Sequence, residues 1–121
     1  MSRITNWRRK SRTPTLEYRN TETDARAVLH RAPDSYRYKW HGAILVDGYP
    51  VWSRGYETKD GKSFRDELRK RPAPELNCSE CPNDDVLVGE KSADGAKVQR
   101  WFDCPDCGHE APSRIVYGAE R

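Results

Sequence analysis

The sequence has little aliphatic material and no long apolar run. Leucine, isoleucine, valine and phenylalanine together supply only 18 of its 121 residues. Such a low share is typical of disordered chains, but 4 tryptophans, 6 tyrosines and a net charge of only +3 argue against disorder for most of this one. We therefore expect one small domain or two very small ones, stabilised by something besides an aliphatic core. The size excludes a large enzyme core with a deep cleft.

Membrane-spanning and secretory segments are also missing. No segment reaches the roughly 18 consecutive apolar residues that a membrane-spanning helix needs. The polar residues after Met1 lack the apolar stretch of a secretory signal. We therefore expect a cytoplasmic protein that does not bind membranes and whose thiols stay reduced.

Cysteine is scarce, yet its placement is informative. The 4 cysteines form two Cys-x-x-Cys pairs, Cys78 with Cys81 and Cys104 with Cys107. This spacing predicts one structural zinc ion held by all four thiolates, with no coordination position left open. Two disulfides would need an oxidising compartment, whereas an iron site with the same ligands stays open as an alternative. We interpret His109 as a turn or surface residue.

The segment between the cysteine pairs has the composition of a β-hairpin. Residues 86–88 and 98–102 are rich in strand-forming side chains, and Asp94-Gly95 favours a tight turn between them. Residues 114–117 offer a third strand. Two cysteine pairs brought together by a three-stranded antiparallel sheet make a zinc ribbon.

The stretch from Cys78 to His109 resembles the C-terminal zinc ribbon of the transcript-cleavage elongation factors of the TFIIS class. In that family an Asp-Glu pair at the hairpin tip helps to hold a catalytic metal in the polymerase active site. Asp94 matches the first acid, but Gly95 stands where the second would be. A single carboxylate is a poor Mg²⁺ ligand set, so the resemblance implies the zinc-ribbon fold more than the cleavage activity. A plain turn accounts for the same two residues.

Residues 13–72 alternate as in an antiparallel β-meander that ends in a helix. The helix is predicted over residues 63–71, with Ser63 and Asp66 as its capping pair and Phe64 and Leu68 on its buried face. Pro72 ends it. The expected strands are residues 15–19, 25–31, 36–41 with 43–46 as a continuation or a new strand, and 49–56 after a turn at Asp47-Gly48.

Residues 36–71 also resemble, more loosely, a group of small uncharacterised β-β-β-α proteins. The matching residues are Ser53-Arg54-Gly55-Tyr56 and Thr58-Lys59. This resemblance implies no known reaction.

Aromatic and basic side chains alternate from residue 36 onward. Tyr36, Tyr38 and Trp40 would share one face of a strand, and Arg37 and Lys39 would lie on the other. The aromatic face would suit base stacking. The shortage of aliphatic residues favours placing it in the core instead, with Arg37 and Lys39 still exposed to phosphate.

The densest basic cluster lies near the N-terminus. Arg8, Arg9, Lys10 and Arg12 follow Trp7, so this segment suits an arm along a nucleic-acid backbone, with Trp7 stacked on a base. A solvated tail is the alternative. Charge is uneven along the chain: residues 1–76 carry +7 and residues 77–121 carry −4.

The predicted fold class is α+β: an N-terminal antiparallel β-meander with one helix, followed by a C-terminal three-stranded zinc ribbon. The expected segments are a basic flexible arm (1–12), the meander with its helix (13–72), a proline-containing linker (73–77) and the four-cysteine ribbon (78–121).

These features favour a non-enzymatic, nucleic-acid-associated protein, such as an accessory of transcription or RNA handling. The alternative is an adaptor whose acidic ribbon docks a basic protein partner. The sequence has no nucleophile triad, phosphate loop or open metal position, and His30, His41 and His109 are scattered along it. We therefore expect no enzyme activity and no small-molecule substrate.

Overall fold

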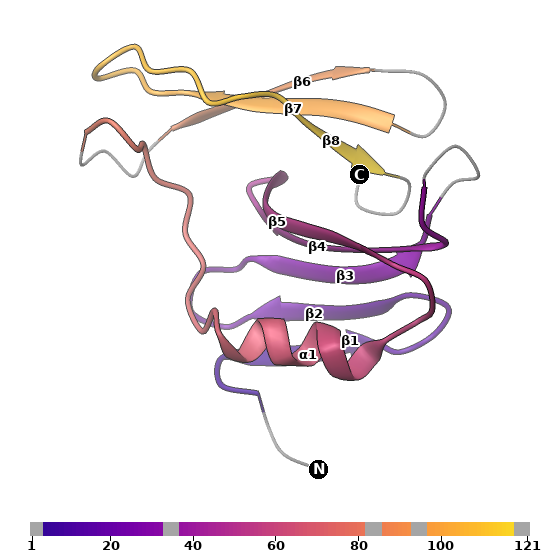
Figure 1. The fold of residues 1–121 in the computed structure, drawn as a ribbon. Coiled ribbons are helices and arrows are strands. Elements are labelled where there is room, and N and C mark those ends of the chain that lie inside the picture. Colours follow the sequence, from indigo (N-terminus) through magenta and orange to yellow (C-terminus); the bar gives the residue numbers. More distant parts are fainter. Residues whose placement is uncertain (1–3, 33–36, 82–85, 93–96, 118–121) are drawn as a thin grey trace.

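The computed structural model describes residues 4–32, 37–81, 86–92 and 97–117, and these form two antiparallel sheets and one helix (Figure 1). The first sheet has the order β1-β2-β3-β4-β5 and the second has the order β6-β7-β8. The class is therefore α+β with mainly antiparallel strands, as predicted. The elements are β1 (Trp7–Ser11), β2 (Leu16–Asn20), β3 (Arg26–Arg31), β4 (Trp40–Val46), β5 (Tyr49–Tyr56), α1 (Gly61–Arg69), β6 (Leu87–Ser92), β7 (Lys97–Asp103) and β8 (Arg114–Tyr117).

Part of the basic N-terminal segment is a strand, β1, which corrects the prediction of a flexible arm for residues 7–11; residues 1–3 lie outside the described residues. Within β1, Trp7 pairs with Asn20 and Arg9 with Tyr18 of β2. The Trp7 side chain is only 4% exposed and joins the core, so it is not free to stack on a base. Trp7, which the sequence suggested as a base-stacking residue, therefore holds the strand against the core.

The predicted strand at residues 36–41 is confirmed only at its end, because β4 begins at Trp40 and continues through residues 43–46, whereas residues 37–39 are not in a strand. Trp40 pairs with Tyr56 of β5, whereas the ring of Tyr38 covers Gly55, the neighbouring residue of the same strand. Since consecutive residues of a strand face opposite sides, Tyr38 and Trp40 lie on opposite faces of the sheet. Tyr36 lies outside the described residues. The other two aromatic residues, Tyr38 and Trp40, do not share the single face that the sequence predicted.

Helix α1 covers one face of the first sheet (Figure 1). It begins two residues before the predicted start, because the Asp60 side chain, rather than that of Ser63, accepts the capping hydrogen bond, here from the Ser63 backbone N–H at 3.0 Å. Phe64 and Leu68 are fully buried, as expected. A Cβ atom at Gly42 would lie 3.1 Å from the Phe64 ring, so a glycine in β4 lets the helix approach the sheet.

The segment after α1 is held to the first sheet by hydrogen bonds to two carbonyl groups. Trp7 Nε1 donates to the Arg71 carbonyl at 2.9 Å. The side-chain amides of Asn6 and Asn20 donate to the Pro72 carbonyl at 2.9 and 3.0 Å. These bonds fix the end of the helix against β1 and β2.

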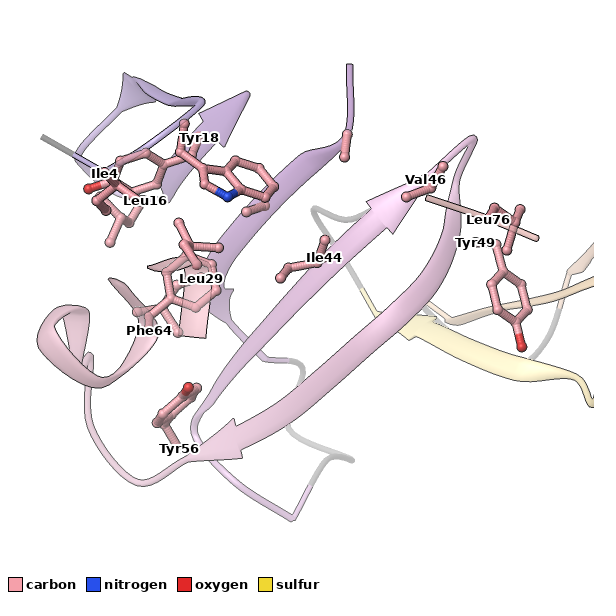
Figure 2. Close-up of a cluster of buried hydrophobic side chains, with 14 of the residues drawn as sticks. Ile4, Leu16, Tyr18, Leu29, Ile44, Val46, Tyr49, Tyr56, Phe64 and Leu76 are labelled. Carbon is pink, nitrogen blue, oxygen red and sulfur yellow. The ribbon is translucent and has the colours of Figure 1, made fainter. Parts of the chain in front are cut away.

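The two sheets share one hydrophobic core. Phe102 of β7 packs edge-on against Tyr49 of β5, with ring centroids 5.0 Å apart, and the Tyr49 hydroxyl donates to the Pro112 carbonyl at 3.2 Å. Leu76, inside the predicted linker, is 6% exposed and belongs to the same core (Figure 2). Arg114 of β8 adds a hydrogen bond to the Pro50 carbonyl at 3.1 Å. The second sheet is therefore packed against the β4–β5 hairpin.

Candidate functional site: a four-cysteine cluster and a basic groove

The four cysteines that the sequence singled out meet at one end of the second sheet. Their Sγ atoms all lie within 4.8 Å of one another. The Cys78–Cys107 and Cys81–Cys104 sulfur pairs are each 3.5 Å apart, and none of the four forms a disulfide. In a tetrahedron with metal–sulfur bonds of about 2.3 Å, sulfur atoms lie about 3.8 Å apart. The donor set and its spacing therefore fit one four-coordinate metal ion.

Tight turns bring the two cysteine pairs into this position. Cys104 comes directly after β7, and its backbone carbonyl accepts a hydrogen bond from Gly108 N–H at 2.9 Å. Gly108 has a φ of +76°, a conformation that glycine adopts without strain. In the first pair, the Glu80 N–H donates to Cys78 Sγ at 3.4 Å. In both pairs, a backbone N–H that follows the first cysteine therefore donates back to that cysteine, which closes the turn that brings the two thiols together.

The pKa of the Cys107 thiol is raised. The backbone N–H of His109 and the Cys81 thiol lower it, but desolvation and the neighbouring thiols of Cys78 and Cys104 raise it more. A bound divalent cation reverses such a shift, because it deprotonates coordinating thiols.

Histidine does not join the metal group. His109 Nε2 instead lies 3.2 Å from Ser79 Oγ, which links the two cysteine pairs outside the cluster. His30 and His41 face each other across β3 and β4 with ring centroids 5.6 Å apart, but they are only 1% and 2% exposed. A buried pair of this kind has no access to substrate. Four thiolates around one ion also leave no position for a reacting water.

A second feature is a basic groove between β1 and α1. Its volume is about 870 Å³. Cationic side chains surround it, and Asp66 is the only carboxylate among the residues that line it. We call this feature the basic groove. Its cations are Arg8, Arg9, Arg12, Lys59, Lys62, Arg65 and Arg69.

Five of these cations form no ion pair with a described residue, and four of the five are arginines. In the described part of the chain, Asp66 pairs with Lys62 at 3.6 Å and with Arg69 at 2.7 Å. Lys59 donates to the Arg12 and Pro14 carbonyls at 2.9 and 3.3 Å. Among the described residues, no ion pair engages the groove arginines of β1 and its following turn, or the central arginine of α1. These four are Arg8, Arg9, Arg12 and Arg65.

The other predicted nucleic-acid contacts lie elsewhere. Lys10 is exposed at the irregular end of β1 and does not line the basic groove. Arg37 and Lys39 are exposed in the turn before β4, where the Arg37 guanidinium lies 5.4 Å from the Tyr38 ring centre. Of the predicted basic residues, Arg8, Arg9 and Arg12 therefore line the basic groove, whereas Lys10 lines a second hollow that it shares with Arg8.

The cations that α1 contributes to the groove were not among the predicted site residues. Lys62, Arg65 and Arg69 are spaced by three and four residues, so they share one face of the helix. That spacing is visible in the sequence and could have indicated a basic stripe. What it could not indicate is that this stripe lies beside β1.

Two further sequence features fall outside the described residues. Asp94-Gly95, on which the resemblance to the elongation factors partly rests, lies in residues 93–96. Asp84 and Asp85, two acidic residues of the ribbon that the alternative adaptor function would use, lie in residues 82–85. Within the described residues, no helix is long and apolar enough to cross a membrane.

Fold and site together define a small, mainly antiparallel β-protein with one helix and a four-cysteine cluster positioned to bind a metal. The chain belongs to a family of unknown function, DUF7568, whose model matches residues 1–121. No curated protein and no solved structure matches it. The family description names neither a zinc ribbon nor an elongation factor.

Proposed function

We propose that this chain is a non-enzymatic, nucleic-acid-associated protein stabilised by a structural zinc ribbon. The observation that carries the proposal is the basic groove, where four arginines without ion pairs surround a concave surface. We propose an accessory role in transcription or RNA handling, and, as a separate expectation from the sequence, a cytoplasmic location.

Zinc is the metal that best suits the cluster. Four cysteine thiolates in a tetrahedron are typical of structural zinc sites, although iron uses the same ligands. The three-stranded sheet β6-β7-β8 and the two chelating turns correspond to a zinc ribbon. Zinc bound there stabilises the second sheet and, through Phe102 and Leu76, the core shared with the first sheet. Elemental analysis distinguishes the two metals directly. The colour of the protein is a second test, since a zinc protein is colourless and a ferric iron–thiolate protein is red.

The basic groove supports nucleic acid as the ligand on electrostatic grounds. Unpaired arginines neutralise phosphates and release their condensed counterions, which gives affinity without sequence preference. Arginine also presents a planar fork of donors that matches phosphate oxygens. The second half of the chain carries −4 and would repel a phosphate backbone, so binding is expected on the first sheet and α1.

A binding assay with a matched control tests the proposal. Replacing Arg8 and Arg65 with alanine removes two unpaired groove cations, whereas replacing Arg37 and Lys39 removes the same charge outside the groove. At low salt, the wild-type protein should bind a fluorescent oligonucleotide, the groove variant about tenfold or more weakly, and the control nearly as well as wild type. No detectable binding by the wild type, or equal losses in the two variants, would contradict the proposed role of the groove.

A further inference from the structure

The basic groove is not uniformly polar, because apolar side chains form its floor. Ile4, Trp7, Leu16 and Tyr18 line it beneath the cationic rim. Figure 2 shows Ile4, Leu16 and Tyr18 close together on the side of the sheet that carries α1. All four residues belong to the hydrophobic core and are only 4–6% exposed, so the recess is bordered by their edges rather than by a broad apolar surface.

Arg65 connects the rim to the floor. A Cβ atom at Gly61 would lie 2.9 Å from Arg65 Nη1 and 3.7 Å from Leu16 Cδ2. The guanidinium therefore folds back over the first turn of α1 and lies beside the apolar floor. Planar guanidinium groups stack on aromatic rings, which lysine ammonium groups do not do in the same way.

We propose that the basic groove binds single-stranded nucleic acid, with an unpaired base lying on the apolar floor beside Arg65 and the flanking phosphates on the arginine rim. This inference rests on the proposed function and names the form of nucleic acid that the site takes. The groove volume of about 870 Å³ suits one or two nucleotides, since sites for small organic ligands are typically about 300–1,000 Å³.

A nucleic-acid duplex cannot make the same contacts with the basic groove. Its bases are paired and stacked inside the helix, so only its phosphates would reach the rim and the floor would stay uncovered. A single strand can place a base in the recess and keep its phosphates near Arg8, Arg9 and Arg12. The buried Trp7 is not a stacking platform, because it is only 4% exposed and its Nε1 donates to the Arg71 carbonyl.

Oligonucleotides that differ only in their bases test the inference on the full, zinc-loaded chain. The probes are a short single strand, its duplex, and an abasic strand of the same length with the same phosphates. The single strand should bind about 5- to 150-fold more tightly than the abasic strand, since stacking of one base contributes about 1–3 kcal/mol. The duplex should bind no better than the abasic strand.

Arg65→Lys provides a second, charge-conserving test. We expect the variant to keep the salt dependence of binding and to lose much of the preference for the normal strand over the abasic one, with wild-type thermal stability. Equal affinity for the normal and abasic strands, or tighter binding of the duplex, would overturn the inference and leave the proposed function standing. Absence of binding to every probe would instead overturn the proposed function, and binding of polyglutamate as tightly as the single strand would identify an acidic peptide site.

Discussion

Replacing Trp7 with alanine tests whether the basic N-terminal segment is a strand of the sheet or an arm. Trp7 is 4% exposed, belongs to the main core and donates a 2.9 Å hydrogen bond to the Arg71 carbonyl. Truncating a buried tryptophan costs about 3–5 kcal/mol. For a chain of this length that corresponds to a fall of about 12–20 °C in Tm, a large part of the stability of a small domain. If residues 7–11 were a flexible arm, replacing Trp7 with alanine would leave Tm unchanged.

Two further variants separate packing from hydrogen bonding. Trp7→Phe keeps an aromatic ring but removes the indole donor, so we expect a loss of about 1–2 kcal/mol. Lys10→Ala changes an exposed residue of the same strand and should stay within about 0.5 kcal/mol of wild type. Thermal and urea unfolding followed by circular dichroism measure all three. A Trp7→Ala protein with the Tm of wild type would refute the assignment of β1.

Three other changes probe the cluster, the turn after β2 and the helix. Cys104→Ser should remove the bound metal, as measured by elemental analysis, and should lower Tm; retention of one metal per chain at wild-type stability would contradict the four-cysteine site. Asn20→Ala removes the donor to the Pro72 carbonyl and the acceptor of the Glu22 and Thr23 N–H groups, and should cost about 1–3 kcal/mol in urea unfolding. Burial alone would raise the pKa of the Glu67 carboxyl, but hydrogen bonds from Arg71 and Lys70 lower it more. The carboxylate therefore stabilises the fold above its unfolded pKa of about 4.3, and this contribution is lost as the pH falls through the lower folded value. Glu67→Gln should be less stable than wild type by up to about 1 kcal/mol at neutral pH and equal to it in acid; a difference independent of pH would refute the pairing.

Local patterns predicted much of the fold. The alternation of residues 25–31 and the Asp47-Gly48 turn predicted β3 and the β4–β5 hairpin, and Phe64 with Leu68 predicted the buried face of α1. The cysteine spacing predicted a cluster that the structure brings together. In each case the determining interactions are close in sequence or follow from a simple spacing rule, so the sequence carries them directly.

The errors have a common physical cause in long-range packing. Trp7 sits among charged residues, and its segment is a strand because it pairs with β2 and because the Trp7 side chain is buried and bonded to a residue far away in the sequence, at the Arg71 carbonyl. Tyr38 precedes β4 instead of belonging to it, because its ring covers Gly55 of β5. Likewise, the basic groove arises where α1 lies next to β1, a juxtaposition that no local pattern encodes.

The salt dependence of single-strand binding tests the central claim most directly. If Arg8, Arg9, Arg12 and Arg65 each neutralise one phosphate, the slope of log K against log[salt] should be about −2.8, from about −0.7 for each contact on a single strand. Replacing Arg8 and Arg65 with alanine should bring the slope to about −1.4, whereas replacing Arg37 and Lys39 should leave it unchanged. A wild-type slope near zero, or one that the groove substitutions do not alter, would contradict the basic groove as a nucleic-acid site.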